Sequence, residues 1–150
     1  MVTSNEKITI KTISSKETYP VRKIVLRPNQ DEKSVIFEGD DLEDTSHFGL
    51  YVNEKLVSIT SIYKRPLKDY DLNGWQLRAM ATLPEYQGKG FGKKLLSACI
   101  KHVEENNGSY IWCNARKNAV NYYKKFDFKI ISDEFEITSI GLHFIMVRKM

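Results

Sequence analysis

The stretch TLPEYQGKGFGKKLL, residues 82–96, places three glycines and three lysines between an apolar run and a run of helical character. Gly88, Gly90 and Gly92 lose more conformational freedom on folding than other residues and offer no side chain to pack. Glycines at such a junction are typical of a turn where another molecule approaches the main chain closely. A helix that begins there leaves its first N–H groups without acceptors, and the helix dipole adds positive character. The stretch therefore predicts an anion-binding turn.

The sequence on either side of these glycines predicts a strand before them and a helix after them. Residues 75–83 (WQLRAMATL) are rich in apolar side chains, and Pro84 ends this strand because it lacks an N–H donor. From residue 91 to about residue 105, apolar residues recur at helical spacing. Residues 109–115 (SYIWCNA) predict the next strand, and residues 117–126 (KNAVNYYKKF) predict a short helix with Asn118 near its start. This strand–helix–strand unit indicates a right-handed crossover between parallel strands.

The rest of the chain predicts mostly antiparallel elements. Alternation in residues 8–13 predicts a strand, and residues 47–63 predict a hairpin that turns at residues 53–55. Lys16 to about Leu26 predicts a helix with Pro20 in its first turn, whereas residues 27–46 are polar and acidic and indicate a solvated loop. Residues 128–137 and 143–150 predict two final strands. The order predicts an α/β fold in a single domain that covers residues 1–150.

The composition narrows the class of protein and its partners. The net charge of +4 favours an anionic ligand, but the chain lacks the aromatic residues interleaved on a basic strand that nucleic-acid binding needs. No apolar run approaches the roughly 18 residues that cross a bilayer, and the N-terminus does not have the pattern of a signal peptide. Cys99 and Cys113 form neither a disulfide framework nor a metal-ligand spacing. We therefore expect a cytoplasmic protein with no metal and no membrane or nucleic-acid partner.

Three known phosphate-binding patterns can be compared with the glycine stretch. A P-loop needs one more residue between its glycines, and it needs Ser or Thr where Lys94 stands. A dinucleotide-binding turn needs G-x-G-x-x-G, whereas the spacing here is G-x-G-x-G. The pattern Gln/Arg-x-x-Gly-x-Gly/Ala is met at every position by QGKGFG, residues 87–92. That pattern resembles the pyrophosphate loop of the GCN5-related N-acetyltransferase (GNAT) superfamily.

Two longer stretches carry the same resemblance. LRAMATLPEYQGKGFGKKLL, residues 77–96, resembles the central motif of the family, and NARKNAVNYYKKFDF, residues 114–128, resembles the motif that follows it. The resemblance implies a mixed, mostly antiparallel central sheet of about seven strands, with a splayed parallel pair and about four flanking helices. The family usually has glycine where Asp127 stands. Aspartate tolerates a left-handed backbone better than most residues, so we expect the turn to persist.

The resemblance also implies that acetyl-CoA binds mainly to main-chain groups. In the family, pantetheine pairs with the end of the central strand, where the main chain also polarises the thioester carbonyl. The corresponding residues here are Met80, Ala81 and Thr82 for pantetheine, and Gln87, Gly88, Lys89, Gly90, Phe91, Gly92 and Lys93 for the pyrophosphate.

The resemblance places Tyr123 at the position of the catalytic acid, where its hydroxyl could protonate the departing thiolate; the alternative is a packed aromatic residue. Asn118 would reach the pantetheine arm, or else it lies at the N-cap or first turn of its helix. Glu85 is a candidate general base, with a solvated loop carboxylate as the alternative. Glu136 and His143 belong to the C-terminal segment that often lines the acceptor cleft, and we assign them to substrate binding. A base that acts through relayed water is also compatible with the sequence.

The predicted function is transfer of the acetyl group of acetyl-CoA to a primary amine, by direct attack in a ternary complex. The acceptor would be a small molecule or a protein amino group, and homodimers are common in the family. The alternative is a non-catalytic sensor of the same fold that binds acyl-CoA. Tyr123 favours the enzyme, because a sensor has no use for a proton donor at the sulfur. The lack of an obvious base keeps the sensor open.

Overall fold

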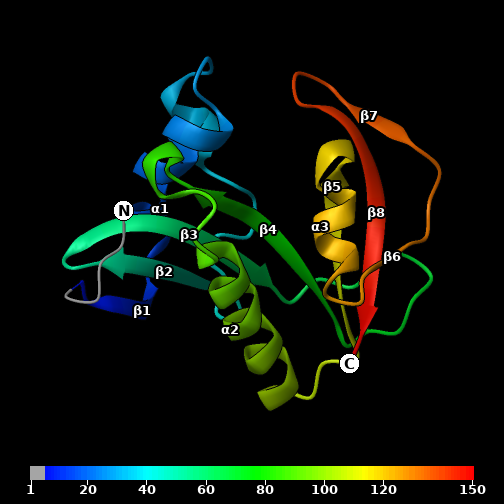
Figure 1. The fold of residues 1–150 in the computed structure, drawn as a ribbon. Helices are drawn as coiled ribbons and strands as arrows, with labels where there is room; N and C mark the ends of the chain where they lie inside the picture. The colour runs from blue at the N-terminus through cyan, green and yellow to red at the C-terminus, as the bar shows by residue number, and fades with distance from the viewer. Residues whose placement is uncertain (1–5) are drawn as a thin grey trace. The chain divides into compact units, whose positions relative to one another are not determined.

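The computed structural model describes residues 6–150, which form two compact units (Figure 1). Unit 1 contains the described residues up to Tyr63 together with Ala79–Lys101. Unit 2 contains Lys64–Arg78 and His102–Met150. The chain therefore passes from one unit to the other after Tyr63, after Arg78 and after Lys101.

The described residues form eight strands, three α-helices and four shorter helical turns. The strands follow the order β1-β2-β3-β4-β5-β8-β6, with β7 paired to β8, and among the described strands β4 and β5 are the parallel pair. The predicted mixed, mostly antiparallel sheet is confirmed. The bounds are β1 Ile8–Ile13, β2 Ser46–Val52, β3 Lys55–Tyr63, β4 Gly74–Thr82, β5 Tyr110–Arg116, β6 Lys129–Ile130, β7 Phe135–Ile137, β8 Gly141–Lys149, α1 Ser15–Val21, α2 Phe91–Glu105, α3 Val120–Lys124, η1 Arg22–Leu26, η2 Glu32–Val35, η3 Pro84–Tyr86 and η4 Lys117–Ala119.

In unit 1, α1 begins at Ser15 because Ser14 caps it. Ser14 Oγ accepts the Glu17 N–H at 3.3 Å, and Glu17 Oε1 accepts the Ser14 N–H at 3.0 Å, which is a capping box. The prediction that Pro20 lies in the first turn is therefore wrong, since Pro20 is the next-to-last residue of α1. The chain continues from α1 as a π-helix, η1. Pro20 has no N–H to donate to a main-chain hydrogen bond of the helix. The π-helical turn that follows it is a rare irregularity.

The hairpin of β2 and β3 turns at Asn53 and Glu54, as predicted. Asn53 has φ +57°, the left-handed backbone that a two-residue hairpin turn needs and that asparagine tolerates. Asn53 Oδ1 also accepts the N–H of Lys7 at 3.0 Å, just before β1. β1 pairs antiparallel with β2, so the three strands form a continuous antiparallel sheet.

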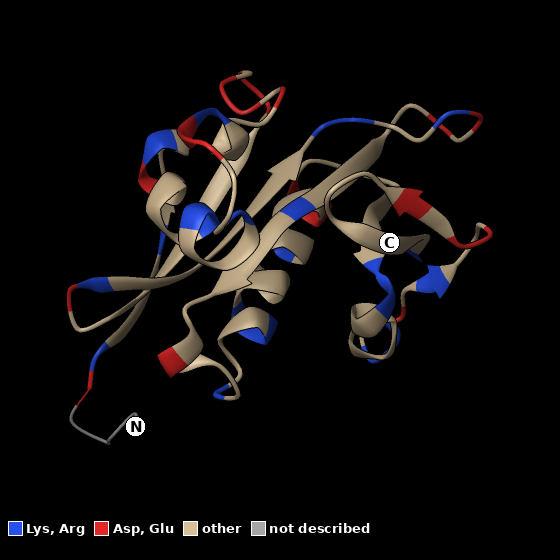
Figure 2. Ribbon diagram, turned by 90° about the horizontal axis from the view of Figure 1, so that it is seen from above, with Lys and Arg blue, Asp and Glu red and all other residues tan. Residues whose placement is uncertain are grey.

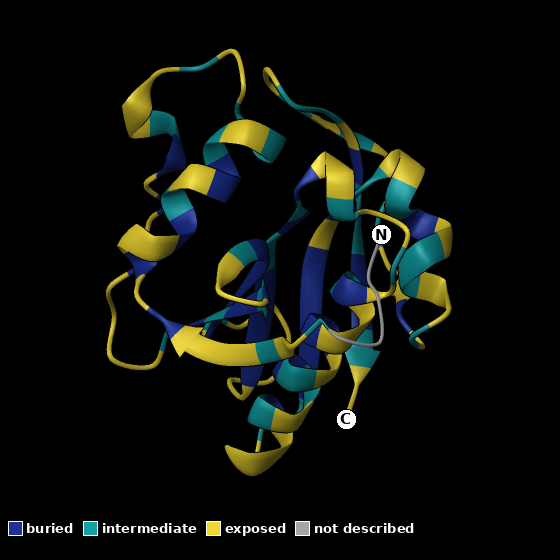
Figure 3. Cartoon of the chain, turned by 60° about the vertical axis from the view of Figure 1, so that its left-hand side comes forward, coloured by how far each residue is buried: buried dark blue, intermediate teal, exposed yellow. Residues whose placement is uncertain are grey.

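The apolar core of unit 1 joins its strands to the first turns of α2. Leu50, Val57 and Ile59 from β2 and β3 are fully buried, and they belong to one cluster with Phe91 and Leu95 of α2. Burying a large apolar side chain contributes about 1.5–3 kcal/mol. Figure 3 shows the resulting division of α2 into buried and exposed sides. This packing fixes where α2 begins, directly after the glycine stretch.

A buried ion pair in unit 1 corrects the prediction that residues 27–46 form only a solvated loop. Arg22 Nη1 and Nη2 donate to the Asp40 carboxylate at 2.7 and 3.0 Å, and Tyr63 Oη donates to the same carboxylate at 2.6 Å. Arg22 and Asp40 side chains are 0% and 2% exposed. Asp40 therefore anchors this segment to the core, while Glu43 and Asp44 nearby are exposed as predicted.

In unit 2, the start of β4 pairs in parallel with β5, through residues 74–76 and 110–112. β5 pairs antiparallel with β8 along its whole length. Tyr110, Trp112 and Val147 form a buried cluster on one face of these strands. Tyr110 Oη donates to Asp71 O at 3.0 Å and accepts the Leu67 N–H at 2.9 Å, which ties the segment before β4 to the cluster.

The C-terminal part of unit 2 contains one strand more than predicted. Residues 128–137 form two short strands, β6 and β7, and both pair with β8. Asp127, in the turn before β6, has φ +66°. The expectation that aspartate supports the left-handed turn at the position of the family's glycine is confirmed.

Candidate functional site

The glycine turn of unit 1 adopts a backbone that depends on glycine. Gly88 and Gly90 have φ +79° and +81°, where residues with a Cβ are strained. A Cβ built on either glycine would meet no atom within 4 Å. Packing therefore does not explain these two glycines. Their backbone conformation does, and the turn presents its main chain to open space.

The start of α2 presents main-chain donors toward this turn. The first helical hydrogen bond there runs from Lys94 N–H to Gly90 O at 3.2 Å. The amides of Phe91, Gly92 and Lys93 precede it, and no acceptor for them lies within residues 6–150. The first turn of α2 carries no acidic residue, and Figure 2 shows basic residues on this helix. Unsatisfied donors, the helix dipole and lysines together favour an anion.

Two of the predicted pyrophosphate residues use their side chains for structure. The Phe91 ring is buried in the core, so only its main chain is available to a ligand. Gln87 Nε2 donates to Thr82 O at 3.0 Å and so joins the glycine turn to the end of β4. Lys89 is half-buried and Lys93 is exposed.

The end of β4 is held by a residue that sequence reasoning missed. Ser58, fully buried on β3, donates to Ala81 O at 3.2 Å and lies 2.7 Å from Thr82 Oγ1. Ala79, just before Met80, has φ +59°, an unusual backbone for a residue with a Cβ and one found in bulged strands. The sequence did contain one signal for this role of Ser58, because it is a small polar residue within a largely apolar strand. The structure thus fixes Met80, Ala81 and Thr82 with the glycine turn in unit 1.

Glu85 lies on η3, between β4 and the glycine turn, and its side chain is exposed. No hydrogen bond or ion pair to Glu85 occurs within the described part of the chain. Its position in unit 1 fits either a base that acts through water or a solvated carboxylate, so its role stays a prediction.

Tyr123 lies on α3 in unit 2, where its ring contacts Tyr122 and Phe128 with centroids 5.4 Å from each. Tyr122 also packs against Phe126 at 5.2 Å, and burial raises the pKa of the Tyr122 hydroxyl. Tyr122 is thus a packing residue of α3. Tyr123 is half-buried, like Tyr122, and its role as the acid stays a prediction.

Asn118 lies in η4 and is exposed. It does not cap α3, because the N-cap residue there is Ala119 and no side chain bonds to that helix end. Of the alternatives left open by the sequence, the N-cap is therefore wrong. An exposed amide in the turn before α3 is compatible with ligand contact.

Glu136 and His143 do not share a face of the β7–β8 ladder. Glu136 pairs with Leu142, whereas His143 pairs with Phe135, so the two side chains point to opposite faces. His143 is buried, its ring stacks on Phe135, and its Nδ1 lies 2.7 Å from Gly141 O. Because the carbonyl oxygen of Gly141 can only accept a hydrogen bond, Nδ1 of His143 carries the proton in this contact. In the neutral ring, Nε2 is then the nitrogen with the free lone pair.

The two cysteines do not supply a nucleophile. Burial raises the pKa of both Cys99 and Cys113 to about 12, so both thiols stay protonated at neutral pH. Since the thiolate is the reactive form, an acyl-cysteine intermediate is disfavoured. The described residues also contain no group of three His, Cys, Asp or Glu that could hold a metal ion. None of the helices among them has the length and apolar character to cross a membrane.

Comparison with known proteins shows which family the chain belongs to. Residues 29–148 match the family described as Acetyltransferase (GNAT) domain. The chain is 32% identical over 143 residues to the uncharacterised N-acetyltransferase YitI of Bacillus subtilis, and the match covers 94% of this chain and 95% of YitI.

Solved structures share the fold at lower sequence identity. The ribosomal-protein-S18-alanine N-acetyltransferase of Escherichia coli superposes with a TM-score of 0.76 at 21% identity, covering 95% of this chain and 94% of that one. An aminoglycoside 6'-N-acetyltransferase in complex with coenzyme A superposes with a TM-score of 0.75 at 12% identity, covering 94% and 96%. The chain therefore belongs to the GNAT family of acetyltransferases, and N-acetyl transfer is the general activity that this membership supports.

Proposed function

We propose that the protein transfers the acetyl group of acetyl-CoA to a primary amine, by direct attack in a ternary complex. The observation that carries the proposal is the start of α2, where the amides of Phe91, Gly92 and Lys93 face an open turn built on Gly88 and Gly90. This arrangement suits the diphosphate of coenzyme A, because the absence of side chains at the two glycines lets an anion reach the amides. Four further points remain expectations: an amine as the partner, a cytoplasmic location, a single domain over residues 1–150, and a homodimer.

The end of β4 would hold the pantetheine arm through main-chain groups of Met80, Ala81 and Thr82. Ser58 and Gln87 support this role, since they fix the carbonyls of Ala81 and Thr82. A rigid main chain is suited to stabilising the oxyanion that forms when an amine attacks a thioester. Lys89 and Lys93 would add positive charge for the diphosphate, and Asn118 would contact the pantetheine arm.

The chemistry needs one proton donated and one removed. The thioester of acetyl-CoA supplies the acetyl group, and the lone pair of the neutral amine displaces the thiolate. Tyr123 would donate its hydroxyl proton to that thiolate. The proton lost by the attacking nitrogen would pass to Glu85 through water, with His143 Nε2 and Glu136 as the other groups that could accept it or contact the amine.

Replacing Tyr123 with phenylalanine is expected to lower kcat about a hundredfold or more, since general acids contribute factors of that size. The ring contacts with Tyr122 and Phe128 stay in place, so the Kd for acetyl-CoA should not change. Steady-state release of CoA thiol measures kcat, and calorimetry measures Kd. Tyr122→Phe is the matched control and should keep wild-type turnover. Equal turnover in Tyr123→Phe and wild type would remove Tyr123 as the acid.

A screen of amines tests the proposed function as a whole. Acetyl-CoA at millimolar concentration should raise Tm, because a ligand that binds only the folded state stabilises it. CoA thiol should then appear only with a suitable amine. Acetyl-CoA binding without thiol release across polyamines, aminoglycosides and peptide N-termini would favour the acyl-CoA sensor. No change in Tm would contradict both functions.

A further inference from the structure

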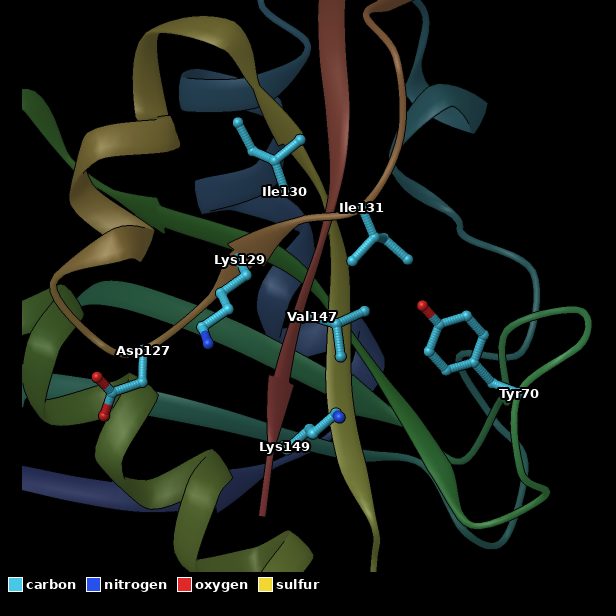
Figure 4. Close-up of a pocket in the computed structure, with 7 residues that line it drawn as sticks. All are labelled: Tyr70, Asp127, Lys129, Ile130, Ile131, Val147 and Lys149. Carbon is cyan, nitrogen blue, oxygen red and sulfur yellow. The ribbon is translucent and has the colours of Figure 1, made fainter.

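A pocket in unit 2 has no part in the proposed acetyl transfer. It encloses about 550 Å³, a size typical of small-molecule sites. Figure 4 shows the side chains that line it, from the segment before β4, the turn after α3, strand β6 and the residue that follows it, and strand β8. They are Tyr70, Asp127, Lys129, Ile130, Ile131, Val147 and Lys149.

The floor and one wall of this pocket are apolar. Val147 is buried against Tyr110 and Trp112, whereas Ile130 and Ile131 are 37% and 41% exposed. Such exposed aliphatic side chains beside a hollow are typical of binding surfaces. The ring of Tyr70, also 41% exposed, lies 5.4 Å from that of Tyr110. The aromatic contact holds Tyr70 as a side wall.

Two lysines add positive charge beside the apolar floor. Lys129 pairs with Val147 across β6 and β8, and Lys149 is two residues further along β8, so all three share one face of the ladder. Neither ammonium group has an ion-pair or hydrogen-bond partner among residues 6–150. The lining carboxylate, Asp127, lies 3.4 Å from Nη1 of Arg148 instead. The two lysines thus leave an uncompensated positive charge at the pocket.

We propose that this pocket binds a small amphipathic anion, a carboxylate attached to an aliphatic or aromatic body. The apolar part would cover Ile131 and Val147, and the carboxylate would lie between Lys129 and Lys149. The charges favour such a ligand over a second copy of the chain. A two-fold contact through this face would bring four lysines together with only two carboxylates, one Asp127 from each copy, and each Asp127 already lies near Arg148 of its own chain.

Octanoate is the probe, with three relatives that each change one property. Octylammonium reverses the charge, octanol removes it, and acetate removes the apolar body. Methyl NMR spectra report binding at Ile131 and Val147. We expect octanoate to shift these signals saturably, octanol to bind more weakly, and octylammonium and acetate to have no effect. Raising the salt concentration should weaken octanoate binding, since ions screen exposed charges.

The double variant Lys129→Gln/Lys149→Gln should weaken octanoate binding roughly fivefold, the size expected for two exposed ion pairs. Lys124→Gln/Lys125→Gln, at the C-terminal end of α3, is the matched control and should keep wild-type affinity. Two results would contradict the proposal that the ligand is an anion: equal affinities for octanoate and octanol, or an unchanged affinity for octanoate in the Lys129/Lys149 variant. If octanoate caused no methyl shifts up to its solubility limit, the pocket would not be a binding site for such anions. Shifts that depend on protein concentration alone would indicate a second copy instead.

Discussion

Replacing Asp40 with alanine is expected to lower the free energy of unfolding by about 3–5 kcal/mol, the usual cost of breaking a buried ion pair. Asp40 accepts from both Nη atoms of Arg22, from Tyr63 Oη and from the main-chain N–H of Phe37. Without the carboxylate, the fully buried guanidinium keeps neutral acceptors, which are Val35 O, Ser61 Oγ and Tyr63 Oη. An uncompensated buried charge is the physical reason for the large loss.

Chemical denaturation with urea measures this loss. Glu43→Ala, in the same acidic segment but exposed, is the control and should change stability by less than about 0.5 kcal/mol. The double variant Arg22→Met/Asp40→Leu should regain most of the stability, because it removes both charges. A loss below about 1 kcal/mol in Asp40→Ala would show that the pair does not anchor residues 27–46.

The same ion pair predicts an acid limit to stability. Burial by itself raises the pKa of Asp40, but hydrogen bonds from Arg22, Tyr63 and Phe37 outweigh it and hold the pKa below the ordinary 3.8. The folded chain thus binds this proton less readily than the unfolded chain. Ionised Asp40 stabilises the fold above about pH 3.8, and this contribution is lost as the pH falls below that value. Asp40→Asn should lack this part of the pH dependence.

Replacing Gly90 with alanine is expected to weaken acetyl-CoA binding about a hundredfold, which corresponds to losing one or two charge-assisted hydrogen bonds. The new Cβ would occupy the open space through which an anion reaches the amides of α2, and φ +81° would strain the turn. The fold should survive, since no atom lies within 4 Å of the new Cβ.

Calorimetric titration with acetyl-CoA measures the affinity of Gly90→Ala, and thermal unfolding measures its stability. Gly141→Ala is the matched control, because Gly141 also has a positive φ, +124°, and no atom within 4 Å of its Cβ position. The Gly141→Ala variant strains the backbone at residue 141 and leaves the glycine turn at residues 88–90 unchanged. A Gly90→Ala protein that binds acetyl-CoA as tightly as Gly141→Ala would refute close approach of the diphosphate to the turn.

Local patterns in the sequence predicted much of the fold. The apolar spacing in residues 91–105 matches α2, Phe91–Glu105, because one face of that helix is buried. The β2–β3 hairpin was predictable from Asn53, since its turn needs a left-handed backbone. The glycine turn was predictable for a similar reason, since glycine is the residue that tolerates the positive φ values found at Gly88 and Gly90.

Features that depend on distant partners could not be predicted. Arg22 and Asp40 are 18 positions apart, and nothing local indicates that one neutralises the other inside the core. Ser58 and Ala81 are 23 positions apart, so the support of β4 was missed. The pocket was missed as well, because its lysines come from two strands with no motif.

The central claim is that the first amides of α2 bind the diphosphate of coenzyme A. The most direct measurement is a titration with CoA, followed by ¹H–¹⁵N NMR at the amides of Phe91, Gly92 and Lys93. We expect large downfield shifts at these amides with CoA and none with pantetheine, which lacks the diphosphate. Shifts of equal size with both ligands, or none at these amides under saturating CoA, would contradict the claim.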